Sequence, residues 1–167
     1  MLTLYMISGV MGVGKTTVSQ SLKNKLPNCV FLDGDWCWDM HPFQVTQETK
    51  AMVIENICFL LNNFIQCSCY QNIIFCWVMH EQVIIDTILS KLDLTNCQVI
   101  NLSLICSKEA LQERLQKDIK EGKRDLHILK KSLSYLPLYE DIQSIKIDVS
   151  NQSIESITQS IIDLQNT

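Results

Sequence analysis

The sequence predicts an α/β fold in which a five-stranded parallel sheet carries helices on both faces. Segments with strand-like and helix-like patterns alternate along the chain, which is typical of parallel sheets. The strand-like segments are apolar throughout rather than at every second residue, as expected for strands buried on both faces. With 167 residues, of which 47% are hydrophobic and 19% charged, the chain has the size and composition of one domain spanning residues 1–167.

The first part of the chain opens with an apolar run, Leu2–Ile7, which is followed by a glycine-rich segment and predicts the first strand. Apolar side chains at helical spacing predict a helix over Lys15–Leu26, and Pro27 ends it. A second apolar run predicts a strand over Cys29–Leu32, and the longer segment Thr46–Gln66 predicts the second helix.

The same alternation continues in the second part of the chain. The apolar run Asn72–Val78 predicts a third strand, followed by a helix over Glu81–Leu92 and a fourth strand over Gln98–Cys106. Ser107 is placed to cap a helix that extends to about residue 121. A short fifth strand is expected over Ile145–Asp148, and a last amphipathic helix carries Ile154, Ile157, Ile161 and Leu164.

Charge and cysteine content narrow the range of partners and surroundings. The 14 Lys and Arg against 18 Asp and Glu give a net charge of −4, which argues against nucleic acid or an anionic membrane as a main partner. The eight cysteines form no C-x-x-C pair and most lie in apolar runs, so we expect buried thiols rather than a metal or disulfide framework. The first residues lack the basic start of a signal peptide, and no apolar run is long enough to span a bilayer. We therefore expect a soluble, cytoplasmic protein.

The most specific motif lies between the first expected strand and the first expected helix. Residues 9–16 fit the pattern G-x-x-x-x-G-K-[ST] of a phosphate-binding loop, the P-loop or Walker A motif, in the strand–loop–helix context that this pattern requires. Glycines allow backbone N–H groups to surround phosphates, and the helix N-terminus adds partial positive charge. Lys15 is expected to bridge the β- and γ-phosphates, and Thr16 to bind Mg²⁺. We therefore predict ATP and Mg²⁺ as cofactors, with binding residues Gly9, Met11, Gly12, Val13, Gly14, Lys15, Thr16 and Thr17.

Two carboxylates follow the second expected strand, in the segment Asp33-Gly34-Asp35. Because ligands bind outside the carboxyl ends of strands in such sheets, both are expected near the terminal phosphate. We assign Asp35 as the base that accepts a hydroxyl proton, and Asp33 as the metal-anchoring anion, since no aspartate ends the third strand. Asp39 is an alternative base, and a solvated Asp-Gly turn is the alternative to a functional site.

The P-loop together with this D-G-D segment resembles the shikimate kinase-like group of P-loop small-molecule kinases, which carry D-x-D after their second strand. The similarity continues in Glu113-Arg114-Leu115, in Arg124 and in Leu136-Pro137-Leu138-Tyr139. The resemblance implies a P-loop NTPase fold, which is a three-layer sandwich, and transfer of a phosphoryl group from ATP to a small-molecule hydroxyl. It also implies that Arg114 contacts adenine and that Arg124 closes over the reacting group from a lid at about residues 117–131.

The half of the chain expected to bind the acceptor departs from the shikimate kinases. Those enzymes hold a carboxylate with arginines, one of which precedes the motif A-P-L-Y, where this chain has Tyr135. Between Leu26 and Ser107 the chain contains Lys50 and Lys91 but no arginine, which disfavours an anionic acceptor. We therefore expect a neutral or cationic acceptor bound by stacking and hydrogen bonds near the helical region 36–66, with contacts from Asp35, Trp36, Trp38, Trp77 and His80. The alternative is that these aromatic side chains close the core.

Three functions remain open on the sequence alone. We favour an ATP-dependent small-molecule kinase, a phosphotransferase with an alcohol group as acceptor, in which Lys15, Asp35 and Arg124 are catalytic. A nucleotide or nucleoside kinase is one alternative, and a regulatory ATP-binding or ATPase module without a small acceptor is the other. A GTPase is disfavoured because the chain has no N-K-x-D segment. The sequence leaves the acceptor's identity and the oligomeric state undecided.

Overall fold

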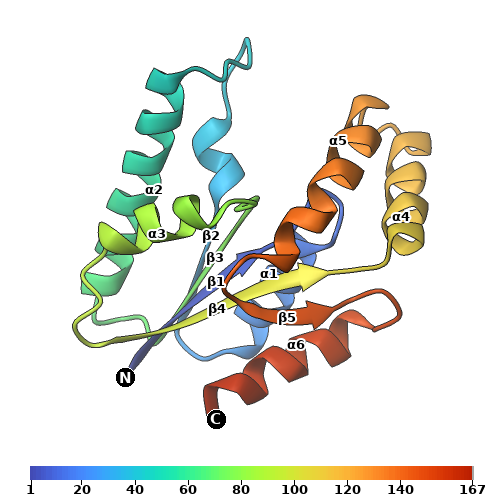
Figure 1. The fold of residues 1–167 in the computed structure, drawn as a ribbon. Helices are drawn as coiled ribbons and strands as arrows, with labels where there is room; N and C mark the ends of the chain where they lie inside the picture. Colours follow the sequence, from blue (N-terminus) through green and yellow to red (C-terminus); the bar gives the residue numbers. More distant parts are fainter. Residues whose placement is uncertain (167) are drawn as a thin grey trace.

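A sheet of five parallel strands, in the order β2-β3-β1-β4-β5, forms the middle layer of the computed structural model, which describes residues 1–166 (Figure 1). Each expected strand is present, with ends within one residue of those expected, and the predicted fold class is confirmed. The strands are β1 (Leu2–Ser8), β2 (Cys29–Asp33), β3 (Asn72–Trp77), β4 (Cys97–Ile105) and β5 (Ile145–Asp148).

Helices cover both faces of the sheet. Helices α1 and α6 pack together on one face, while α2 packs with α3 on the other (Figure 1). This arrangement follows from right-handed crossovers, because the connections from β1 to β2 and from β2 to β3 run in opposite directions across the sheet. The helices are α1 (Lys15–Lys25), α2 (Gln47–Gln66), α3 (Gln82–Ser90), α4 (Lys108–Lys120), α5 (His127–Tyr135) and α6 (Ile154–Asp163), with 3₁₀ helices η1 (Gly34–Trp38), η2 (Leu136–Glu140) and η3 (Leu164–Asn166).

Strand β1 lies at the centre of the sheet, between β3 and β4. Its residues Leu4, Tyr5, Met6 and Ile7 are completely buried, which explains why the run is apolar at every position. Because the strands are parallel, their carboxyl ends share one edge of the sheet, and the loops that follow β1, β2 and β3 meet there.

The structure contains a helix that the sequence analysis does not predict, α5, together with the following η2. Its nine residues are fewer than an isolated helix needs to be stable in water, so the segment depends on its neighbours. The hydroxyl of Ser132, a buried residue of α5, donates to the backbone oxygen of Met11 at 2.6 Å, and the helix packs against α4. Tertiary contact with the P-loop therefore stabilises this element.

The eight cysteines are free thiols. Cys58, Cys76 and Cys106 are buried as expected, whereas Cys69 is exposed, and the remaining four are only partly buried: Cys29, Cys37, Cys67 and Cys97. The expectation of buried thiols is therefore confirmed for three of the eight. Over residues 1–166, no helix is both long enough and apolar enough to cross a bilayer.

Candidate active site

The loop between β1 and α1 depends on glycine for its shape. Gly12 has φ 84°, and a Cβ at this position would lie 2.4 Å from Cδ2 of Leu115, a core residue of α4. Gly14, with φ 109°, is the N-cap of α1 and carries no side chain that could occupy the first N–H groups of the helix. A cavity of about 520 Å³ opens at this loop, so these N–H groups are available to an anion.

Lys15 is a buried cation in the wall of this cavity. The residue is only 9% exposed, and its Nζ donates to the backbone oxygen of Val10 at 3.0 Å. Burial lowers the pKa of Lys15, while the carboxylates of Asp33 and Asp35 oppose that shift. Since an ammonium group has three N–H donors, the bond to Val10 leaves others for a ligand in the cavity. An anion there would offset the cost of burying the charge.

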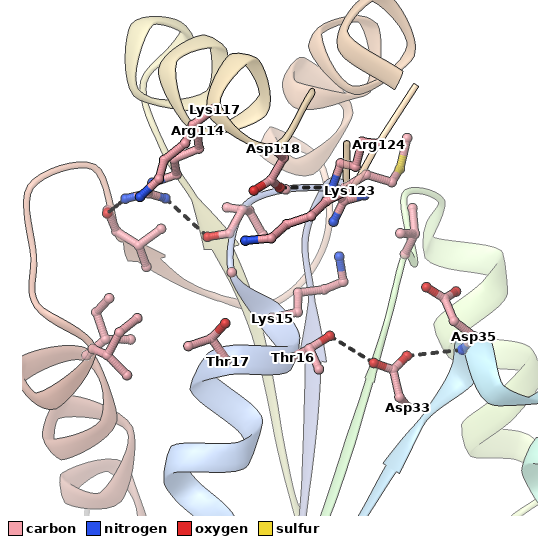
Figure 2. Close-up of a pocket in the computed structure, with 18 of the residues that line it drawn as sticks. Lys15, Thr16, Thr17, Asp33, Asp35, Arg114, Lys117, Asp118, Lys123 and Arg124 are labelled. Carbon is pink, nitrogen blue, oxygen red and sulfur yellow. Dashed lines mark hydrogen bonds and ion pairs between the residues drawn. The ribbon is translucent and has the colours of Figure 1, made fainter. Parts of the chain in front are cut away.

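Thr16 and Asp33 form a pair suited to a hard metal cation. Thr16 Oγ1 donates to Asp33 Oδ2 at 2.9 Å, so the lone pairs of the hydroxyl oxygen remain free for a ligand (Figure 2). The other oxygen of Asp33 accepts from the backbone N–H of Asp35 at 3.1 Å. Within the described residues, no group of three His, Cys, Asp or Glu side chains is arranged to hold a metal. Mg²⁺ at this position would therefore be held by the Thr16 hydroxyl together with oxygens of a bound phosphate or of water.

Asp35 is the second residue after β2, and η1 turns its carboxylate to the cavity. The indole Nε1 of Trp77, at the end of β3, donates to Asp35 Oδ1 at 3.1 Å. The Trp77 ring also covers Gly34, where a Cβ would lie 2.5 Å from Trp77 Cγ. Partial desolvation raises the pKa of Asp35, and the negative charge of Asp33 raises it further, although Lys15 and the Trp77 bond oppose the shift. Asp35 is thus a positioned carboxylate with more basic character than an isolated aspartate.

The opposite wall of the cavity comes from α4 and from the turn between α4 and α5, residues 121–126, hereafter the α4–α5 turn. Ser107 is the N-cap of α4, and its hydroxyl accepts from the backbone N–H of Ala110, which confirms the predicted cap. Figure 2 shows the basic side chains of this wall facing the P-loop across the cavity. They are Arg114, Lys117, Lys123 and Arg124, and the acids Asp118 and Glu121 lie among them.

Arg114 joins two segments that flank the cavity. Its Nη1 donates to Val13 O at 3.1 Å, and its Nη2 donates to Val149 O at 2.5 Å and to Ser150 O at 3.4 Å. These bonds connect the P-loop to the loop after β5. Because they use the edge of the guanidinium group, they leave its planar faces available for stacking on a ring.

Comparison with known proteins identifies the family. The model of a family described as an AAA domain matches residues 6–132, which contain the P-loop, both carboxylates and the α4–α5 turn. The chain belongs to this family. No curated protein matches the sequence.

Solved structures share the fold of this AAA-domain chain over nearly its whole length. The tunicamycin resistance protein of Deinococcus radiodurans has 17% identity and a TM-score of 0.71, with 99% of this chain and 96% of that chain covered. A sugar kinase from Janibacter sp. HTCC2649 has 16% identity and a TM-score of 0.72, with 99% and 95% covered. Shikimate kinase from Bacteroides thetaiotaomicron has 20% identity and a TM-score of 0.61, with 99% of both chains covered. The chain therefore has the fold of P-loop small-molecule kinases.

The cavity of this AAA-domain chain brings together predicted site residues that lie far apart in the sequence. Met11 to Thr17 of the P-loop, the two carboxylates Asp33 and Asp35, and the two arginines Arg114 and Arg124 all line it. Gly9 is not among the residues that line the cavity, and a Cβ at this position would meet Val13 and Leu104.

The expected acceptor residues other than Asp35 are not among the residues that line the cavity. Trp36 is 56% exposed and packs edge-on against Phe31, with ring centroids 5.3 Å apart. Trp38 contacts Phe43 at a centroid distance of 5.6 Å. His80 stacks on Tyr135 at 4.3 Å, and burial lowers its pKa. Trp77 reaches the site through its bond to Asp35.

The structure adds site residues that the sequence analysis does not single out. Asp118 is the one with a sequence signal, because it lies four residues after Arg114 and so shares a face of α4 with it. Lys117, Glu121 and Lys123 fall within the expected lid at about residues 117–131, and Ile154 and Ile157 are expected only as apolar positions of the last helix. Val78, Val149 and Gln152 come from loops and carry no local pattern that marks them as site residues.

Proposed function

We propose that this protein is an ATP-dependent kinase that transfers the γ-phosphoryl group to a hydroxyl of a small, non-anionic acceptor. The family match and the fold shared with sugar, gluconate and shikimate kinases support a kinase. The observation that carries the proposal is a single one: Asp35 lines the same cavity as Lys15 and Arg124 and is held there by Trp77. A module that only bound ATP would not need a positioned base at this edge of the sheet. An ATPase would use such a base to orient water, so stimulation of ADP release by an acceptor is what separates a kinase from an ATPase.

The nucleotide side of the proposal uses the P-loop. Lys15 and the free N–H groups at the start of α1 bind the phosphates, and Thr16, oriented by Asp33, binds Mg²⁺. Mg²⁺ supplies charge neutralisation to the phosphate oxygens when it is bound. Arg114 contacts the adenine ring through a planar face, beside Gln152 and Ile154 of the same cavity.

The chemical step uses Asp35 and Arg124. Asp35 accepts the hydrogen bond of the acceptor hydroxyl and takes its proton as the new O–P bond forms, while ADP leaves with the electrons of the broken bond. Arg124, which enters from the proposed lid at residues 117–131, stabilises the charge of the transferring group. Lys15 acts on the same charge from the P-loop side.

The acceptor side supports an uncharged molecule. The cations that line the cavity come from the P-loop, α4 and the α4–α5 turn. In contrast, the end of β2 and the segments after β2 and β3 contribute Asp33, Asp35 and Val78. Lys91, one of two lysines between residues 26 and 107, forms an ion pair with Glu55 at 2.7 Å. We propose that Trp36, Trp38, Trp77 and His80 contact the acceptor beyond Asp35, at the mouth of the cavity.

The test is a panel of hydroxylated acceptors, including sugars, polyols, nucleosides and phosphorylated compounds, assayed for ADP release. We expect one class of uncharged acceptor to stimulate release, and Lys15→Ala to lower the stimulated rate at least about 10²-fold, since it removes a preorganised charge at the reacting phosphates. Lys23→Ala, at the other end of α1, is the matched control and is expected to retain the wild-type rate.

Two results would contradict the proposal in different ways. ADP release that no acceptor stimulates would favour a regulatory ATPase module. Stimulation that is strongest with a nucleoside monophosphate would favour a nucleotide kinase and would remove the argument for an uncharged acceptor.

A further inference from the structure

The contact between Asp118 and Arg124 is the interaction on which the further inference rests. The Nε of Arg124 donates to Asp118 Oδ2 at 3.1 Å, and both side chains are about one-third exposed, at 30% for Asp118 and 35% for Arg124. The two residues lie six positions apart, across the end of α4, so neither helical spacing nor a shared strand brings them together.

The backbone of the α4–α5 turn makes this contact possible. Gly122 has φ 71°, and its N–H donates to Ile119 O at 3.0 Å. The N–H of Lys123 then donates to the backbone oxygen of Asp118 at 2.9 Å. This glycine-dependent end of α4 reverses the chain and returns residue 124 to the face of the helix that carries Asp118.

The atoms used in the contact determine which part of Arg124 remains available. A guanidinium group has five N–H donors, one on Nε and four on the two Nη atoms. Asp118 bonds to Nε, which leaves the Nη edge for a ligand in the cavity. Arg124 and Asp118 both line the cavity, and Figure 2 shows the Arg124 side chain beside Asp118 and above Lys15. Burial is the main cause of the shifts, which lower the pKa of Lys15 and raise that of Asp35, and the charge of Arg124 makes a smaller, lowering contribution to both, as expected for a cation that faces them.

We propose that Asp118 is a positioning residue, which holds Arg124 with its Nη edge directed at the terminal phosphate of bound nucleotide. This inference rests on the proposed function and adds a residue to it. An unrestrained arginine side chain loses rotational freedom when it binds, whereas one already fixed through Nε loses less. Asp118 therefore strengthens the contact of Arg124 with the γ-phosphate without touching the nucleotide.

The neighbouring ion pair of the same turn provides a contrast. Lys123 pairs with Glu121, and their side chains are 64% and 40% exposed. The ammonium group of Lys123 is a point charge without a planar set of donors, so its bond to Glu121 does not direct a particular edge at a ligand. Exposed ion pairs also contribute little to stability. Asp118 differs from Glu121 because it binds the Nε of an arginine and so sets the direction of the Nη edge. The affinity for nucleotide therefore tests its role better than the free energy of unfolding does.

The experiment measures binding of two nucleotides by calorimetry with Mg²⁺ present: ADP, and the non-hydrolysable ATP analogue AMPPNP, which adds the third phosphate. Arg124→Ala is expected to weaken AMPPNP binding roughly 10–100-fold, the range for a charge-assisted hydrogen bond, and to leave ADP within about twofold of wild type. Asp118→Asn is expected to weaken AMPPNP about 3–10-fold with the same sparing of ADP. Asp118→Glu, which keeps the carboxylate, should recover most of the loss.

The double variant separates a positioning role from a structural one. If Asp118 acts through Arg124, adding Asp118→Asn to Arg124→Ala causes no further loss of AMPPNP binding, because the group it positions is gone. Glu113→Gln, an exposed charge removal on the same helix, is the matched control and is expected to bind both nucleotides as wild type does.

Four outcomes would overturn the inference. Asp118→Asn could bind AMPPNP as well as Glu113→Gln does, or more tightly than the wild type. It could also weaken ADP and AMPPNP binding equally, or its loss of AMPPNP binding could multiply with that of Arg124→Ala in the double variant. Failure of the proposed function looks different. In that case the wild-type protein binds neither nucleotide, or Lys15→Ala leaves AMPPNP binding intact.

Discussion

The proposed nucleotide side and the proposed acceptor side of the cavity are built in different ways. On the nucleotide side, Met11 to Thr17 are consecutive residues, and all of them line the cavity. On the acceptor side, Asp35 is fixed by Trp77, which is 42 residues away in sequence, while Trp36 and Trp38 pack against neighbouring aromatic rings instead of lining the cavity.

The difference shows what local sequence is able to specify. A P-loop is determined by short-range requirements: glycines at positive φ, a lysine at the start of the helix and a hydroxyl after it. A site for an acceptor is assembled from several strand ends and a helix, so its shape depends on which side chains turn inward after the sheet forms. We therefore expect substitutions on the two sides to affect different kinetic constants.

The largest effect is expected from Asp35→Asn, at the boundary between the two sides. Loss of the base should lower kcat by roughly 10²–10⁴-fold while AMPPNP binding stays close to wild type. Because desolvation raises the pKa of Asp35, its protonation begins at a higher pH than for an exposed aspartate. Wild-type activity should thus fall as pH drops through that raised pKa, and the pH–rate profile of Asp35→Asn should lack this decrease.

Asp39→Asn is the control for this assignment, because Asp39 is the alternative base and does not line the cavity. Retention of full turnover by Asp35→Asn, or an equal loss in Asp39→Asn, would contradict the role of Asp35.

An intermediate effect is expected from Gly12→Ala, which would disturb the packing of the P-loop against Leu115 of α4. The new Cβ would meet Leu115 at 2.4 Å and would force a residue with a side chain to adopt φ 84°. Crowding in a packed core costs about 1–3 kcal/mol, and left-handed backbone adds about 1–2 kcal/mol. Thermal denaturation should show a lower Tm.

Gly122→Ala isolates the backbone contribution, because Gly122 has φ 71° but a Cβ added there would have no neighbouring atom within 4 Å. We expect Gly12→Ala to lower the free energy of unfolding more than Gly122→Ala does. Equal losses would mean that contact with Leu115 does not constrain the P-loop.

The smallest effect is expected from Trp36→Ala on the acceptor side. If Trp36 contacts the acceptor, the KM for the stimulating acceptor should rise about 3–10-fold, in keeping with loss of an aromatic contact, while AMPPNP binding is unchanged. Phe59→Ala, which removes another exposed aromatic ring, on α2, is the control. An unchanged KM would exclude Trp36 from the acceptor site and leave its packing on Phe31 as its role.

Strands β1, β2 and β3 were predictable because each is a mainly apolar run, and burial of a central parallel strand such as β1 demands that pattern. Strands β4 and β5 contain polar residues between their apolar ones. Helix α5 could not be predicted, because a segment of nine residues shows too little hydrophobic periodicity. Its position also depends on the hydrogen bond from the Ser132 hydroxyl to the backbone oxygen of Met11. In the site, Arg114 and Arg124 followed from a family resemblance, whereas the bond between Asp118 and Arg124 depends on a turn that only the folded backbone displays.

By itself, the sequence determined the positions of the strands along the chain, the parallel sheet and the position of the phosphate-binding loop, because hydrophobic periodicity and glycine placement act over a few residues. Only the tertiary structure decided that Trp77 fixes Asp35, that Asp118 holds Arg124, and that Trp36 and Trp38 lie outside the cavity lining. Strand order and right-handed crossovers bring those distant segments together, and side-chain packing at their ends then selects which groups face the cavity.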